Sequence, residues 1–544
     1  MRFSFHPTIL LGLLITGCGS SETSTGTTTG TGGGGTGGSG GGGPEGALVV
    51  KTDKGAVEGA LLGSTRAFLG IPYAAPPTGA LRWKAPAPHE AWTETLKATK
   101  KGMACAQKGT LSSTFDSTTG EDCLTVNVWT PDAPASASLP VLVWIHGGSF
   151  VFGSGGDAAY DGKNLSEKSG FVVVSLNYRL GALGFLGLPA LKSEDAAHPS
   201  TGGYGLEDQR AALEWVKANI AAFGGDPANV TLFGESAGGA STCMHLVSPK
   251  SKGLFQRAII ESGPCDLVNS EKSATEYGDQ LTEALGCKAA ADVLACLRGK
   301  TPEEILGADP PTTSIAGGSW YPSVDGWNLP ELPSKLVEAG SFEKMPTIFG
   351  TNADEGSLFI LLAGAAAMIP DEAAFQTFAE ANIPGHGKEI VDHYPTATYG
   401  TAQKAAIAAI TDGTFTCATR RAARSFSKAG SPTYLYHFTY VPQDALLDGL
   451  GSFHSAEVKY VLGNPSQLQP QPLTKDEKVL SAAMMGYWSR HADKGDPNGE
   501  GAFAWPKYDA TTDEDIVFDL TISKEAGLKK DLCDFWDGIV SKGP

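Results

Sequence analysis

Apolar residues form two kinds of pattern in the first half of this chain. Residues 139–145 and 171–176 are continuous apolar runs, which predict β-strands buried on both faces. Residues 207–222 carry apolar positions at helical spacing, and shorter strand-like runs follow at residues 230–233 and 257–261. Strands that alternate with helices predict an α/β fold with a mostly parallel central sheet flanked by helices. In such sheets the functional site lies at the carboxyl ends of the strands.

A different apolar pattern opens the chain. Residues 9–15 are apolar, follow the positive charge of Arg2, and are too few to span a bilayer, which predicts a signal peptide. Residues 15–18 (Ile-Thr-Gly-Cys) resemble a bacterial lipobox, in which Cys18 is lipidated and becomes the new N-terminus. The alternative is an ordinary signal peptide with an incidental cysteine. Acylation of Cys18 would anchor the protein to a membrane, because each buried methylene adds about 0.8 kcal/mol of membrane affinity.

Residues 19–45 are almost entirely Gly, Ser and Thr, a composition that cannot bury apolar surface and predicts a flexible tether. We therefore expect a signal peptide with lipobox over residues 1–18, a linker over 19–46, and one folded domain over 47–544. This organisation predicts an exported protein, held as a bacterial outer-membrane or cell-surface lipoprotein, or otherwise periplasmic or secreted.

Composition narrows the possible partners. The formal net charge is −18 and no basic patch stands out, so nucleic acid is not an expected partner.

Nine cysteines suit an exported chain. Apart from Cys18, eight remain, and their spacing cannot decide how they pair. We expect no metal site, because the sequence contains no Cys-x-x-Cys pair and no histidine cluster at zinc spacing. The sequence gives no oligomeric state.

The strongest chemical signal is a Gly-x-Ser-x-Gly turn at residues 234–238, between a short strand-like run and a helical run. Gly234 and Gly238 allow strand and helix to approach closely, which would place Ser236 on a strained corner above the sheet. A serine at such a corner is a candidate nucleophile. The alternative is a plain turn, because Gly-x-Ser-x-Gly occurs by chance in a chain with 70 glycines.

A second signal follows the buried run at residues 139–145. Residues 146–150 read His-Gly-Gly-Ser-Phe, and consecutive glycines at a strand end let backbone N–H groups point into a cavity, as an oxyanion hole requires. The alternative is a glycine turn between strands.

A serine nucleophile also needs a base and an acid that orients it. His454 lies in a loop after the strand-like residues 434–440 and is the candidate base, whereas His245 lies on the helix after Ser236 and is expected to be a packing residue. Asp354 and Glu355 both follow the strand-like residues 346–349 and compete for the role of acid.

Several segments together resemble the type-B carboxylesterase/lipase family, which are cholinesterase-like α/β-hydrolases. The motifs are residues 70–82, 121–129, 177–181, 233–237 and 495–498. The resemblance extends from about residue 47 to the C-terminus. It implies an α/β-hydrolase fold with helical insertions over the active site, and a carboxylesterase domain over residues 47–544.

The resemblance also implies a role for each catalytic residue. Ser236 would be the nucleophile, His454 the base, and Glu355 rather than Asp354 the acid. The chain order of nucleophile, acid and histidine is the one expected of α/β-hydrolases. The implied oxyanion donors are the backbone N–H groups of Gly148, Ser149 and Ala237.

Further residues match structural features of the family. Glu235 matches an acidic pocket residue beside the nucleophile, Ser262 a serine near the acid, and Arg82 with Glu121 a structural ion pair. The resemblance leaves Cys243 and Cys265 over, to form a fourth bridge or to stay free. The three disulfides that it implies are Cys105–Cys123, Cys287–Cys296 and Cys417–Cys533.

The implied activity is hydrolysis of a small carboxylic ester through an acyl-enzyme, without a cofactor, with membrane contact only through the lipid anchor. The alternatives are a lipase that acts on longer acyl chains and a non-catalytic cholinesterase-like binding module. Cholinesterases bind the quaternary ammonium through a tryptophan in the first disulfide loop. Here residues 106–122 contain no tryptophan and only one phenylalanine, Phe115, so choline esters are not the favoured substrates.

Overall fold

The computed structural model describes residues 46–108, 118–309, 319–362, 369–446 and 449–542. The predicted signal peptide and most of the predicted linker, with Cys18, therefore lie outside the described residues, and so does Phe115. In the described part of the chain, no helix has both the length and the apolar content that a membrane crossing requires.

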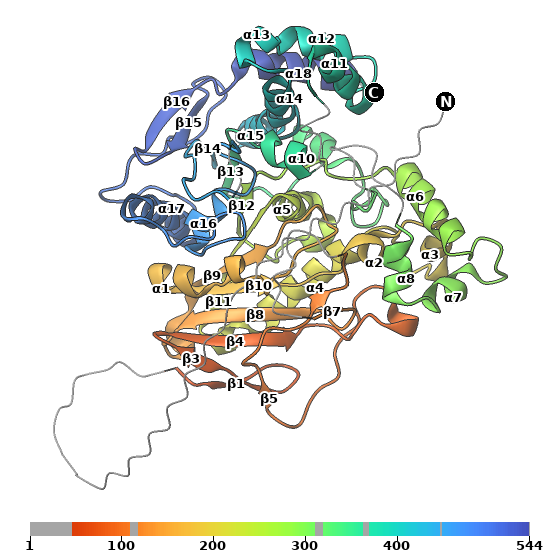
Figure 1. The fold of residues 1–544 in the computed structure, drawn as a ribbon. Helices are drawn as coiled ribbons and strands as arrows, with labels where there is room; N and C mark the ends of the chain where they lie inside the picture. Colours follow the sequence, from red (N-terminus) through yellow and green to blue (C-terminus); the bar gives the residue numbers. More distant parts are fainter. Residues whose placement is uncertain (1–45, 109–117, 310–318, 363–368, 447–448, 543–544) are drawn as a thin grey trace, which may run out of the picture. The chain divides into compact units, whose positions relative to one another are not determined.

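An eleven-stranded sheet forms the centre of the domain (Figure 1), in the order β16-β15-β14-β13-β12-β11-β9-β10-β8-β4-β3. Every neighbouring pair from β10 to β15 is parallel, whereas β16 and the three strands beyond β10 pair antiparallel. The prediction of a mostly parallel sheet is confirmed. The strands are β3 (Ala60–Leu62), β4 (Thr65–Pro72), β8 (Thr125–Pro131), β9 (Leu139–Ile145), β10 (Val172–Leu176), β11 (Gly225–Glu235), β12 (Arg257–Glu261), β13 (Thr347–Asn352), β14 (Thr433–Phe438), β15 (Glu514–Phe518) and β16 (Ser523–Ala526).

Two small sheets accompany the central one. They contain β1 (Val49–Lys51), β2 (Ala56–Glu58) and β5 (Leu96–Lys97), and β6 (Ala104–Cys105) with β7 (Thr119–Gly120).

Helices cover both faces of the central sheet, and β9 shows why. Its alternate residues point to opposite faces. Val143 belongs to one buried cluster, with Leu213 of α4 (Tyr204–Asn219) and residues of α5 (Ala237–Val247). Trp144 belongs to another, with Met484 of α17 (Lys475–Lys494) and residues of α1 (Lys163–Ser169). A continuous apolar strand is therefore buried on both sides.

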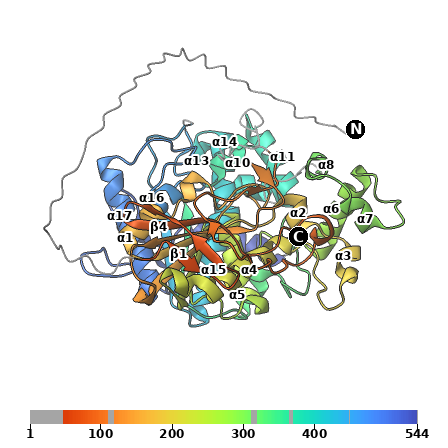
Figure 2. The ribbon, with the colours of Figure 1, turned by 90° about the horizontal axis from the view of Figure 1, so that it is seen from below.

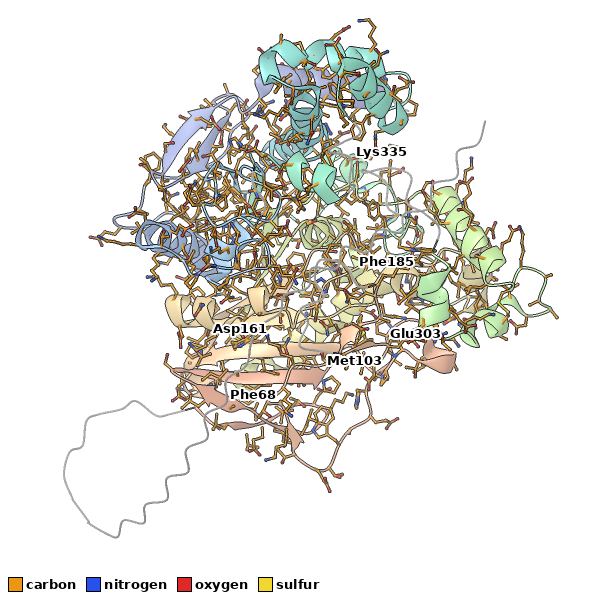
Figure 3. All side chains as sticks on the ribbon, in the orientation of Figure 1. Phe68, Met103, Asp161, Phe185, Glu303 and Lys335 are labelled. Carbon is orange, nitrogen blue, oxygen red and sulfur yellow. A yellow bond between two sulfur atoms is a disulfide. The ribbon has the colours of Figure 1, made fainter. Side chains whose placement is uncertain are left out.

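The side chains fill the space between the sheet and the helices (Figure 3), where the labelled Phe68 of β4 and Phe185 of α2 (Gly181–Phe185) belong to one cluster. Figure 2 shows α1 beside α16 (Val458–Leu462) and α17. The predicted helix at residues 207–222 begins earlier, at Tyr204, and its last turn tightens into a 3₁₀ turn, Ile220–Phe223. It ends at Gly224, whose φ of +94° a side chain would disfavour.

Two helical insertions interrupt the parallel strands. The first joins β12 to β13 and the second joins β13 to β14. The second contains a π-helix, Thr411–Thr416, between two α-helices. The remaining helices are α3 (Pro189–Glu194), α6 (Glu271–Ala284), α7 (Val293–Arg298), α8 (Pro302–Gly307), α9 (Pro333–Glu338), α10 (Gly356–Leu362), α11 (Glu372–Asn382), α12 (Gly387–His393), α13 (Thr396–Tyr399), α14 (Ala402–Ile410), α15 (Cys417–Lys428) and α18 (Lys530–Lys542).

Disulfides tie these segments together. Cys417 at the start of α15 bonds to Cys533 of α18, across 116 residues of sequence. The two cysteines that the resemblance left over also form a bond. The disulfides are Cys105–Cys123, Cys243–Cys265, Cys287–Cys296 and Cys417–Cys533.

Candidate active site

Ser236 lies at the corner between β11 and α5. Its φ of +57° and ψ of −122° are outside the usual regions for a residue with a side chain. Close packing imposes this conformation, because a Cβ added to Gly238 would lie 2.0 Å from the Ile145 carbonyl oxygen. The Ser236 backbone N–H donates to the Glu261 carbonyl of β12 at 2.9 Å. The corner therefore presents Ser236 at the carboxyl end of the parallel strands, where a nucleophile is expected.

The two adjacent acids after β13 have different roles. Glu355 Oε2 lies 2.6 Å from His454 Nδ1 and is fully buried. Asp354 instead accepts the Ser452 backbone N–H through Oδ2 at 2.9 Å, and its own N–H donates to the Ser452 carbonyl, also at 2.9 Å. Asp354 thus holds the loop that carries the histidine, and Glu355 contacts the ring.

Three donors fix the Glu355 carboxylate. Its Oε1 accepts hydrogen bonds from Ser262 Oγ at 2.6 Å, Thr351 Oγ1 at 3.0 Å and the Asn352 backbone N–H at 2.7 Å. The sequence predicted Ser262 near the acid but not Thr351 and Asn352. Their signal was local: two polar residues at the end of a buried strand, shortly before the acid.

His454 is buried between aromatic rings and carboxylates. The rings of Phe359 and Phe415, both from the second insertion, have their centroids 4.9 and 4.8 Å from that of His454. Its Nε2 lies 3.1 Å from Glu235 Oε1, without the alignment of a hydrogen bond, and has no hydrogen-bond partner among the described residues. Burial lowers the pKa of His454, but the nearby Glu235 and Glu355 carboxylates outweigh it and raise that pKa above 6.5.

The loop after β9 supplies candidate oxyanion donors. Gly148 and Ser149 have φ values of +107° and +53°, backbone conformations that residues with a side chain rarely adopt. Within the described residues, the backbone N–H groups of Gly148, Ser149 and Ala237 find no acceptor. A Cβ added to Gly147 would lie 3.0 Å from Ser236 Cβ, so the loop borders the nucleophile closely. Unpaired N–H groups are rare in protein interiors, so these three are the candidate donors to an oxygen anion.

Comparison with known proteins identifies the kind of protein that carries this site. The model of the carboxylesterase family matches residues 46–536. This chain belongs to the carboxylesterase family. Its fold is therefore the α/β-hydrolase fold, and the protein is a carboxylic ester hydrolase.

Three relatives of this esterase cover most of its length. It is 36% identical to the para-nitrobenzyl esterase of Bacillus subtilis (strain 168), over 88% of this chain and 96% of that protein. It is 34% identical to the acetylcholinesterase of Bungarus fasciatus, over 91% of this chain and 87% of that protein. It is also 34% identical to the cholinesterase of Mus musculus, over 90% and 86% respectively.

Other predicted residues of the esterase lie outside the catalytic contacts. His245 is buried on α5, where its ring nitrogens contact Ser251 Oγ at 2.8 Å and Gln209 Oε1 at 3.1 Å. Burial lowers the pKa of His245 to about 3, so the ring is neutral. Arg82 and Glu121 form a partly buried ion pair with an N–O distance of 2.6 Å.

A cavity of about 290 Å³ lies near the site but does not include it. It lies between the residues after Ser262, α9, α11, the π-helix and α18, and its lining is mostly apolar. Gly413 and Thr414 line this cavity, whereas Phe415 of the same π-helix contacts His454. The π-helix therefore lies between the cavity and His454.

Proposed function

We propose that this protein is a serine carboxylesterase that hydrolyses small carboxylic esters with Ser236, His454 and Glu355 through an acyl-enzyme. The observation that carries the proposal is the 2.6 Å contact between Glu355 Oε2 and His454 Nδ1. With Nδ1–H donating to the carboxylate, the tautomer leaves Nε2 unprotonated and able to accept a proton.

Acylation begins when His454 Nε2 takes the proton from Ser236 Oγ, and Oγ attacks the ester carbonyl carbon. The carbonyl oxygen becomes an anion, which the N–H groups of Gly148, Ser149 and Ala237 stabilise. The imidazolium then donates its proton to the ester oxygen, the C–O bond breaks, and the alcohol leaves. Glu355 remains ionised throughout and stabilises the imidazolium.

Deacylation repeats these steps with water. His454 Nε2 takes a proton from a water molecule, whose oxygen attacks the acyl carbon. The second tetrahedral anion collapses, and Ser236 Oγ leaves with the proton returned by the imidazolium. The products are the carboxylic acid and the free enzyme.

The substrates that we propose are esters of uncharged alcohols. Residues 106–122 carry no tryptophan for a quaternary ammonium group, and one relative is named a para-nitrobenzyl esterase. A lipase would instead prefer long acyl chains. Turnover of p-nitrophenyl esters from acetate to palmitate separates the two: rates that fall with chain length support the esterase, and rates that peak at palmitate contradict it.

The same assay tests the triad. We expect Ser236→Ala to lose about a million-fold in turnover, since removal of the nucleophile disables the whole triad. The exposed Ser193→Ala is the matched control and should keep the turnover of the unmodified protein. A Ser236→Ala protein with near-normal turnover would falsify the assignment.

We also propose that the catalytic domain, residues 47–544, is tethered to a bacterial membrane through lipidated Cys18 and the linker at residues 19–46. Metabolic labelling with a radioactive fatty acid tests this in a bacterial host. Label should enter the unmodified chain and be absent from Cys18→Ser. Equal labelling of both, or of neither, would leave an ordinary exported protein.

A further inference from the structure

Ser455, directly after the catalytic histidine, has a φ of +73°. This left-handed conformation favours glycine and is uncommon for residues with a side chain. Glycine at this position would relieve the backbone strain. The chain carries a serine instead, and the serine hydroxyl donates one hydrogen bond.

That contact is with the acid beside the nucleophile. Ser455 Oγ donates a hydrogen bond to Glu235 Oε1 at 2.6 Å. It is the one hydrogen bond that the Glu235 side chain accepts from the described residues. The same Oε1 lies 3.1 Å from His454 Nε2. Glu235 Oε2 faces the loop that follows β9, since a Cβ added to Gly147 of that loop would lie 2.8 Å from Oε2.

Glu235 therefore lies between His454 and the loop that follows β9. Its position decides which group can form a hydrogen bond with His454 Nε2. If its carboxylate moved into line with Nε2, it would compete with Ser236 for that nitrogen. In the structure it lies close enough to stabilise an imidazolium, but Nε2 has no hydrogen-bond partner among the described residues. Among the described residues, the hydroxyl of Ser455 is the group that donates a hydrogen bond to this carboxylate.

We propose that Ser455 is a positioning residue of the esterase, which holds the Glu235 carboxylate beside His454 without letting it occupy Nε2. This inference rests on the proposed function, because it assigns His454 as the base. Ser455 acts through Glu235 and touches neither the ester nor the reacting atoms.

The charge balance around Glu235 gives the sign of the effect. Burial raises the pKa of Glu235, while the charge of His454 and the hydrogen bond from Ser455 lower it. Loss of the hydroxyl should raise this pKa further, so Glu235 would be neutral over more of the pH range and would stabilise the His454 imidazolium less. The other groups whose charges act on Glu235 are the buried Glu261, Glu355, Glu457 and Tyr436 and the partly buried Tyr160.

The experiment is the pH profile of kcat/KM for a p-nitrophenyl ester, measured on Ser455→Ala and Ser455→Gly. Activity requires neutral His454, so it falls as pH decreases through the pKa of His454. Both variants should shift this acid limb downward, in the same direction as a neutral residue at position 235, by about one pH unit at most, the effect of one hydrogen bond to a charged group. Glycine relieves the strain of the positive φ and alanine does not, so a common shift belongs to the hydroxyl.

A third variant, Glu235→Gln, tests whether Ser455 acts through Glu235. It removes a charge that favours the imidazolium, so its acid limb should lie at lower pH than that of the unmodified protein. Adding Ser455→Ala to Glu235→Gln should then cause no further shift. The inference is overturned if active Ser455→Ala keeps the original profile, or if the shift is the same with Gln at position 235. If the unmodified protein hydrolyses no ester, the proposed function fails instead.

Discussion

At the scale of single residues, two adjacent acids make different contacts. Asp354 and Glu355 are both carboxylates after the same strand, and their order alone leaves the choice of acid open. The structure separates them because β13 continues to Asn352, whose N–H and the Thr351 hydroxyl turn toward Glu355. Asp354 then faces the histidine loop.

Ser262 tests how much the orientation of Glu355 matters. Ser262→Ala removes the 2.6 Å hydrogen bond to Glu355 Oε1. A hydrogen bond to a charged group contributes about 1.5–3 kcal/mol, so kcat should fall by about 10–100-fold, with little change in KM. Steady-state kinetics measures both, with Ser193→Ala as the control. Unchanged kcat would mean that Thr351 and Asn352 suffice to hold the acid.

The residues that the sequence could predict are those with local signals. Ser236, Gly148 and Ser149 each follow a buried strand within a few residues, and their glycines mark the sharp turns. The contacts of Ser455 with Glu235 and of Asp354 with Ser452 join segments 220 and 98 residues apart. No local pattern encodes such pairs, because the sheet brings them together only when all its strands have formed.

At the scale of elements, the site depends on how closely β11, α5 and β9 approach. The helical pattern after Ser236 predicted α5, but not how little space separates it from β9. A Cβ on Gly238 would meet the carbonyl oxygen and carbon of Ile145 at 2.0 and 2.7 Å. These are backbone atoms of a central strand, which cannot move aside without disturbing the sheet.

Gly238→Ala should therefore displace the corner and reduce kcat by at least about 100-fold, the penalty typical of a misplacement near 1 Å. Its unfolding temperature should also fall, because the backbone must shift to admit the methyl group. Gly307→Ala is the matched control: that glycine, at the end of α8, has no neighbour within 4 Å of an added Cβ. Calorimetry and the ester assay measure both variants. Equal behaviour of the two would contradict the packing argument.

At the scale of the whole domain, the second insertion adds side chains to the site at the carboxyl ends of the strands. Phe359 and Phe415 of the second insertion pack on His454, and Cys417 follows the π-helix that carries Phe415. The bond from Cys417 to Cys533 fastens this segment to α18, near the C-terminus. The fold class was predictable from strand and helix alternation, whereas this packing of distant helices was not.

The length of chain that each disulfide closes predicts its contribution to stability. Cys417–Cys533 spans 116 residues and Cys287–Cys296 spans nine. Loop-closure entropy then favours the longer bond by about 2 kcal/mol. Replacing both cysteines by alanine should lower the unfolding temperature more for the first pair than for the second, as calorimetry on the two variants can measure. The reverse order would contradict this account.

The central claim, that Ser236 is the nucleophile that His454 activates, is tested most directly by covalent labelling. The folded, active protein is incubated with a p-nitrophenyl phosphonate, and mass spectrometry locates the adduct. We expect one phosphonyl group per chain, on Ser236, with loss of esterase activity in proportion, and no adduct on Ser236→Ala. Label on another residue, or full activity in protein labelled at Ser236, would contradict the claim.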